Sequence, residues 1–123
     1  MPVRYSKQGL AYALSGPMDG PVLVFVNGLG GLQESWFYQV RHFSNEFRIL
    51  TFDHRGNGRS PFRAGPARME TYVDDLVEIL ESEGVEQADF VGISFGSRLL
   101  QKLALSHSEW VRSLTLCAAT SAP

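Results

Sequence analysis

The chain has 123 residues, of which 44% are hydrophobic and 20% are charged, and its formal net charge at pH 7 is -2. These values are typical of one water-soluble globular domain over residues 1–123, and the charge gives no electrostatic reason to expect nucleic acid or an anionic membrane as a partner. No apolar run approaches the ~20 residues that a membrane-spanning helix needs. Cys117 is the one cysteine, so no disulfide is possible within the chain, and we expect a cytoplasmic protein.

The opening segment, residues 3–21, predicts two short antiparallel strands that turn at Gly9 and end at Gly16 and Pro17. Continuous apolar runs follow it, of the kind that is typical of strands buried on both faces of a parallel sheet. These predicted strands are residues 22–28, 47–56, 88–94 and 111–119.

Helical spacing of apolar residues occurs between these runs, over residues 36–47, 69–80 and 99–104. Ser35 is placed to cap the start of the first helix and Asn45 to end it, while Gly84 ends the second. Strands that alternate with helices imply right-handed crossovers. The sequence therefore predicts an α/β fold, with a mostly parallel sheet and helices on both of its faces.

Residues 92–96, "GISFG", close a predicted strand and open a predicted helix. In this context the pattern G-x-S-x-G predicts a sharp turn that presents a nucleophilic serine, Ser94. The turn forces the serine into a strained conformation, and side chains at Gly92 and Gly96 would collide with it. The positive end of the following helix favours a developing oxyanion. A chance pattern that merely turns the chain is the alternative.

Two further stretches end predicted strands in glycine-rich loops: "VNGLGG" at 26–31 and "FDHRGNGRS" at 52–60. Together with the elbow and the order of the elements, they resemble the α/β-hydrolase family over nearly the whole chain. "VNGLGG" resembles the family's oxyanion loop, with Asn27 where histidine is commoner. "DHRGNGRS" resembles its D-x-R-G-x-G-x-S turn, and "VGISFGS" resembles its nucleophile elbow.

This resemblance implies that Ser94 is the nucleophile and that the backbone N–H groups of Leu29 and Phe95 form the oxyanion hole. The other residues of the motifs are expected to shape the site rather than to react. These structural positions are Asn27, Gly28, Asp53, Arg55, Gly92 and Gly96. No cofactor is implied, and no spacing of histidine, cysteine or carboxylate predicts a metal site.

The chain departs from the family in the partners of the serine. Members are about twice as long and take the triad acid and histidine from the part that follows the sixth strand, whereas "AATSAP" at 118–123 holds no carboxylate. His107 is expected about 20 Å along the helix from Ser94, and His42 at the surface of the first helix. His54 leaves a strand at the same edge as Ser94 and is the internal candidate for the base. Its alternative role is to hold the "DHRG" turn.

These features favour a half-size hydrolase that cleaves a small carboxylic ester slowly, because an oxyanion hole without a base retains part of the catalysis. The alternative is a non-catalytic binding or interaction module, or a folded fragment, of hydrolase ancestry. Dinucleotide binding is disfavoured because "GLGG" does not supply G-x-G-x-x-G.

The last predicted strand, residues 111–119, would be an edge here, although the sixth strand of the family is an interior one. Its apolar residues include Leu114 and Leu116. An apolar edge without proline or inward charge is a template for pairing. We therefore expect a homodimer that is joined antiparallel through this strand, with Cys117 near the two-fold axis.

Overall fold

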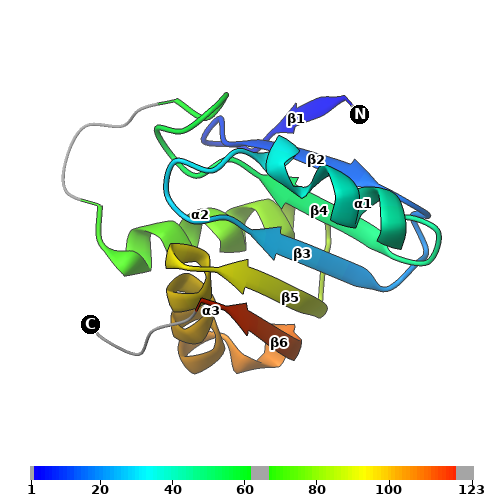
Figure 1. Ribbon diagram of the computed structural model, residues 1–123. Coiled ribbons are helices and arrows are strands. Elements are labelled where there is room, and N and C mark those ends of the chain that lie inside the picture. Colours follow the sequence, from blue (N-terminus) through cyan, green and yellow to red (C-terminus); the bar gives the residue numbers. More distant parts are fainter. Residues whose placement is uncertain (1, 62–66, 119–123) are drawn as a thin grey trace.

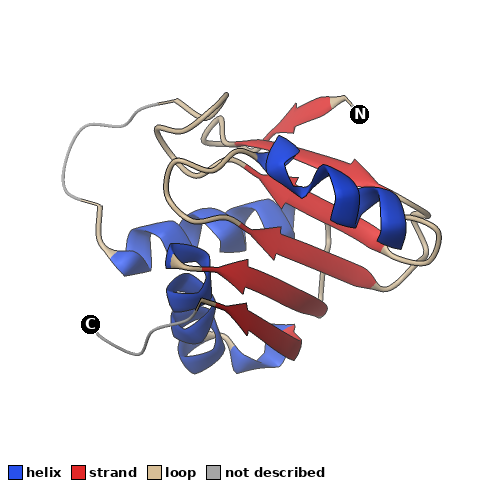
Figure 2. Ribbon diagram, viewed as in Figure 1, coloured by secondary structure: helices blue, strands red, loops and turns tan. Residues whose placement is uncertain are grey.

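The computed structural model describes residues 2–61 and 67–118. Figures 1 and 2 show the arrangement of its helices and strands. In chain order the elements are β1 (Val3–Tyr5), β2 (Ala11–Ser15), β3 (Val22–Val26), the 3-10 helix η1 (Gln33–Trp36), α1 (Phe37–Phe43), β4 (Arg48–Phe52), α2 (Met69–Ser82), β5 (Ala88–Ile93), α3 (Phe95–Ser106), the 3-10 helix η2 (Ser108–Trp110) and β6 (Val111–Cys117).

The described strands form one six-stranded sheet in the order β1-β2-β4-β3-β5-β6. β1 pairs with β2, and β2 with β4, in antiparallel register. β4, β3, β5 and β6 run parallel to one another. The predicted α/β fold with a mostly parallel sheet is therefore confirmed, as is the antiparallel pair at the start of the chain.

Helices cover both faces of this sheet. α2 and α3 lie on one face and enclose the main core, and α1 lies on the other face over a smaller cluster (Figure 1). The largest fully buried side chains come from strands and helices alike: Phe25, Phe52, Phe90, Leu10, Ile49, Leu50, Leu76, Ile79, Leu80, Leu99, Leu100 and Leu103. β3 and β4 are buried from both sides, which is why their apolar sequences do not alternate. The expected burial on both faces is wrong for the other two parallel strands, because β5 alternates between buried and more exposed residues and β6, at the edge of the sheet, is partly or fully exposed along its length.

Several predicted bounds were too long. Polar residues at the carboxyl ends of the runs belong to loops, so β3 ends at Val26 and β4 at Phe52. β6 ends at Cys117, and residue 119 of the predicted strand lies outside the described residues. The parallel strands end at the same edge of the sheet, where these loops meet (Figure 1).

The first helix also differs from its prediction. α1 spans only Phe37–Phe43 and follows the 3-10 helix η1, and its N-cap is Trp36. Ser35 lies inside η1, and its Oγ donates to the Oδ1 of Asn27 and to the carbonyl oxygen of Leu32, so it does not cap the α-helix. Within the described ranges, no helix has the length and apolar character needed to cross a bilayer.

Candidate active site

Ser94 joins the end of β5 to the start of α3 in a strained turn. Its φ is 53° and its ψ is -117°. A positive φ costs a residue other than glycine about 1–3 kcal/mol, and such strain is typical of functional positions. The side chain is exposed, at the carboxyl edge of the sheet. The strained strand-to-helix turn predicted from G-x-S-x-G is thus present.

The two glycines of this turn sit where backbones touch. A Cβ on Gly96 would lie 2.2 Å from the carbonyl oxygen of Val26, and a Cβ on Gly92 would lie 2.9 Å from the backbone of Gly96. Both distances are far below van der Waals contact. The first turn of α3 therefore packs directly on β3 and β5, and this packing fixes the direction in which Ser94 points.

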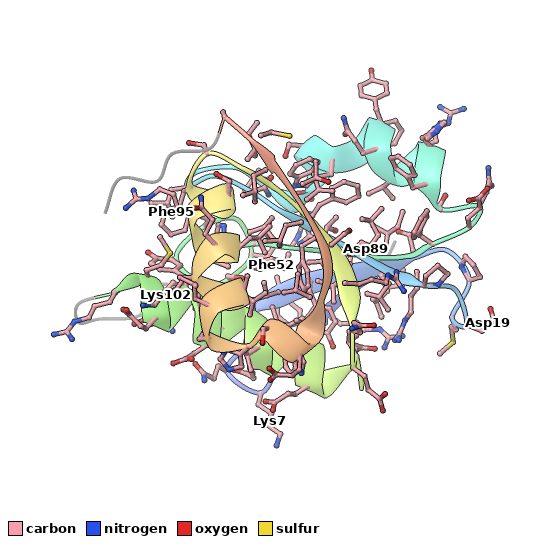
Figure 3. The ribbon with its side chains drawn as sticks, turned by 90° about the horizontal axis from the view of Figure 1, so that it is seen from below. Lys7, Asp19, Phe52, Asp89, Phe95 and Lys102 are labelled. Atoms are coloured by element: carbon pink, nitrogen blue, oxygen red, sulfur yellow. The ribbon has the colours of Figure 1, made fainter. Side chains whose placement is uncertain are left out.

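The loop after β3 lies beside Ser94. A Cβ built on Gly28 would lie 3.6 Å from the Cβ of Ser94 and 4.0 Å from the backbone nitrogen of Phe95. Neither the N–H of Leu29 nor that of Phe95 donates to the backbone of another described residue. Phe95 is the first residue of α3, where N–H groups lack helical partners (Figure 3 labels it at the first turn). In the described part of the chain, the loop that carries Leu29 and the first residue of α3 thus adjoin the serine, and neither of these two amides has a backbone acceptor.

Asp53 binds the backbone of two loops through its carboxylate, which is a structural role. Its carboxylate accepts hydrogen bonds from the backbone N–H of Gln33 at 2.9 Å and from that of Arg59 at 3.1 Å. Ser60 adds a bond from its Oγ to the carbonyl oxygen of Asp53 at 2.6 Å. Asp53 is fully buried, and its carboxylate joins the "DHRGNGRS" turn to the segment that follows the loop after β3.

Arg55 pairs with Asp75 of α2. Two bonds of 2.7 Å join the guanidinium to the carboxylate, and they raise the pKa of Arg55 above its ordinary value. The sequence reading missed Asp75 and Gln33. The signal for Asp75 was its position: it is a charged residue on the buried face of α2, one turn from Tyr72 and from Ile79. Nothing in the sequence pattern singled out Gln33.

His54 is buried, with 2% of its surface exposed. Its Nε2 lies 2.8 Å from the carbonyl oxygen of Asn27. No hydrogen bond joins it to Ser94 within residues 2–61 and 67–118. Burial lowers the pKa of its imidazole below the ordinary value of 6.5. β3 separates its strand from that of Ser94, so this geometry favours a structural role over that of a base.

The remaining histidines lie apart from the serine. His42 is exposed on α1, as expected, and His107 follows the end of α3, where its Nδ1 bonds with the Oγ of Ser106. Over the described part of the chain, no group of three or more His, Cys, Asp or Glu side chains is placed to hold a metal ion. The histidines of the described residues therefore leave Ser94 without a hydrogen-bonded imidazole.

The sequence profile of the alpha/beta hydrolase fold matches residues 21–123. The chain belongs to the α/β-hydrolase family. Among the family's members it is 35% identical over 100 residues to 3-oxoadipate enol-lactonase 2 of Acinetobacter baylyi, covering 81% of this chain and 38% of that one. It is 32% identical over 116 residues to a putative carbamate hydrolase, RutD, of Stutzerimonas stutzeri, covering 91% of this chain and 43% of the relative.

Solved α/β-hydrolase structures superpose closely on this fold. The crystal structure of the enol-lactonase from Burkholderia xenovorans LB400 superposes with a TM-score of 0.86 at 28% identity, over 92% of this chain and 45% of that one. A hydrolase from Pseudomonas aeruginosa PA01 gives the same TM-score at 32% identity, over 94% and 44%. The chain thus spans less than half the length of the relatives it matches.

Proposed function

We propose that this chain carries the nucleophile and the oxyanion hole of a serine hydrolase that cleaves carboxylic esters. The observation that carries the proposal is the strained turn at Ser94, with a φ of 53°. The loop after β3 lies beside it, and the amides of Leu29 and Phe95 have no backbone acceptor among the described residues. A strained backbone conformation costs free energy, and a sharp strand-to-helix turn of this kind exposes the serine side chain at the edge of the sheet.

In the proposed reaction the Oγ of Ser94 attacks the ester carbonyl carbon, and its proton passes to a base that later returns it to the leaving alcohol. The carbonyl oxygen becomes an oxyanion, which accepts hydrogen bonds from the N–H groups of Leu29 and Phe95. The bond to the alcohol oxygen then breaks, the alcohol leaves with a proton, and an acyl group remains on Ser94. Water hydrolyses this acyl-enzyme and returns the serine.

The base in this scheme comes from outside the described residues, since no described histidine or carboxylate bonds with the Oγ of Ser94. A second copy of the chain or a separate polypeptide are its proposed sources. Without a base, the nucleophile and the oxyanion hole sustain only slow turnover. In a well-studied protease that lacks a triad member, the remaining rate enhancement over the reaction in water is about 10³–10⁴-fold. We therefore expect slow hydrolysis of activated esters.

The relatives suggest which substrates to try. An enol-lactonase is named for a cyclic ester and a carbamate hydrolase for a carbamate, and both groups present a carbonyl to a nucleophile. We propose a small ester or lactone as the substrate class. A cytoplasmic location is proposed with it, since Cys117 is an exposed free thiol.

The test is hydrolysis of p-nitrophenyl butyrate, with a simple lactone and a carbamate alongside. Ser94→Ala is expected to abolish hydrolysis. Ser106→Ala is the matched control, because this serine is exposed at the far end of α3, where its Oγ bonds with the carbonyl oxygen of Lys102 and with the Nδ1 of His107. Equal rates for Ser94→Ala and the wild type would show that the hydrolysis is adventitious surface chemistry, as expected of a non-catalytic module.

We also propose that two copies pair through β6. β6 pairs with β5 alone, so its outer backbone groups have no strand partner among the described residues. Leu116 is 36% exposed on this edge, and an apolar edge strand is a template for pairing. An antiparallel pair of β6 strands about a two-fold axis would extend the sheet and bring the partner's loops towards Ser94.

Light scattering at micromolar concentration tests the dimer. The proposal predicts twice the mass of one chain for the wild type, and a lower mass or loss of the folded state for Leu116→Lys. A monodisperse species with the mass of one chain would overturn it. A dimer that Leu116→Lys leaves unchanged would place the interface elsewhere.

A further inference from the structure

The oxyanion loop is fastened at both of its ends by two consecutive residues. At the far end, Asp53 accepts the N–H of Gln33 at 2.9 Å. At the near end, the Nε2 of His54 lies 2.8 Å from the carbonyl oxygen of Asn27. A carbonyl oxygen only accepts, so Nε2 carries the proton and donates. Leu29 lies between these two anchors.

The same imidazole also contacts the other half of the hole. Its ring meets that of Phe95 edge to face, with centroids 5.4 Å apart and planes at 89°. Phe95 in turn packs against Tyr72, at 5.0 Å. His54 is thus one side chain that touches both the loop carrying Leu29 and the residue that offers the second amide.

The donated hydrogen bond is the feature that ordinary core packing does not require. His54 makes edge-to-face contacts with Phe52 at 5.1 Å and with Phe95 at 5.4 Å, and a phenylalanine in its place would retain an aromatic ring for these contacts. It would leave the carbonyl oxygen of Asn27 without this donor. The loop bond Gly31 N–H to Gly28 carbonyl, at 3.2 Å, is local and does not tie the loop to the sheet.

We infer that His54 is a positioning residue of the oxyanion hole, which sets the loop amide of Leu29 against the helix amide of Phe95. It does so through one hydrogen bond to Asn27 and one ring contact with Phe95. The inference rests on the proposed function for its catalytic meaning, although the positioning itself is a property of the fold. In this role His54 acts through the two amides and is not the base of the reaction.

The kinetic test compares His54→Phe, which keeps the ring and removes the donor, with His54→Gln, whose side-chain amide restores a donor. His42→Phe is the matched control, because His42 is exposed and remote from the site. His54→Phe is expected to lower kcat for p-nitrophenyl butyrate about tenfold or more with KM unchanged, because the hole acts on the transition state. His54→Gln is expected to recover most of that loss. Wild-type kcat in His54→Phe, or no recovery in His54→Gln, would overturn the inference.

Should the phenylalanine variant not fold, His54→Leu removes the same donor with a smaller side chain and is judged by the same criteria. Amide NMR separates this inference from the proposed function, since it needs no turnover. The amide signals of Gly28 and Leu29 should move in the variant without the donor and return in His54→Gln, while those of Val24 and Phe90 stay in place. Unmoved loop signals would overturn the inference even if the wild type hydrolyses no ester.

Discussion

Replacing Gly96 by alanine tests the packing that aims Ser94. A Cβ at this position would lie 2.2 Å from the carbonyl oxygen of Val26 and 2.8 Å from that of Asn27. Both obstacles are backbone atoms, so no side chain can rotate away. The start of α3 must retreat by about 1 Å before the contact becomes an ordinary one.

Two effects of this substitution oppose each other. Alanine is favoured over glycine in a helix by about 1 kcal/mol, whereas overpacking a tight site costs about 1–3 kcal/mol and sometimes more. The clash at 2.2 Å with a β3 carbonyl falls at the upper end of that range, so we expect a net loss of about 2 kcal/mol. For a domain of this size, that loss lowers the melting temperature by about 6–12 °C.

Gly28→Ala provides the control on the same surface of the site. A Cβ there would meet the Cβ of Ser94 at 3.6 Å, an ordinary contact, so we expect a melting temperature close to that of the wild type. The assay is thermal unfolding followed by circular dichroism for both variants. A Gly96→Ala protein that melts with the wild type would refute the placement of α3 against β3.

Three further predictions concern Ser94, the ion pair of Arg55 with Asp75, and Tyr12. Ser94→Gly should raise the free energy of unfolding by about 1 kcal/mol, because it relieves a strain of about 1–3 kcal/mol at a φ of 53° and adds a smaller entropic cost. Denaturant titration measures this change, and a loss of stability would argue against the strain. Arg55→Met should lower the free energy of unfolding by about 3–5 kcal/mol, since it leaves the carboxylate of Asp75 buried and unpaired. Adding Asp75→Leu should recover part of that loss. An Arg55→Met protein as stable as the wild type would contradict this prediction. Burial and the bond to Glu83 raise the pKa of Tyr12 from 10.0 to about 12, so the native state holds the phenol proton more tightly than the unfolded state does. About 2–3 kcal/mol of the free energy of unfolding, present below pH 10, is therefore lost between pH 10 and 12. Tyr12→Phe should remove that part of the alkaline loss, and an unchanged profile of unfolding free energy against pH would refute it.

Much of the fold was predictable because its signals are local. Apolar runs predicted the four parallel strands, although only β3 and β4 are buried on both faces. The strand-turn-helix context of "GISFG" predicted the strained turn at Ser94. Bounds were less predictable at the carboxyl ends of strands. Residues such as Asn27 and Asp53 continue a run in the sequence, but their side chains are used in loop hydrogen bonds.

The supporting contacts of the site could not be read from the sequence, because they join segments far apart in the chain. The bond from His54 to Asn27 and the pair of Arg55 with Asp75 depend on how β4 lies against β3 and α2. Pattern analysis identified His54 as a candidate base from its edge of the sheet, and the direction of its side chain is decided by tertiary packing.

Covalent labelling of Ser94 by a fluorophosphonate is the most direct test of the central claim that this serine is a nucleophile beside a formed oxyanion hole. Intact mass and peptide mass spectrometry would follow the reaction, with Ser94→Ala and Ser106→Ala treated in parallel. We expect one adduct, on Ser94, that Ser106→Ala keeps and Ser94→Ala lacks. No adduct at high probe concentration, or an equal adduct in Ser94→Ala, would contradict it.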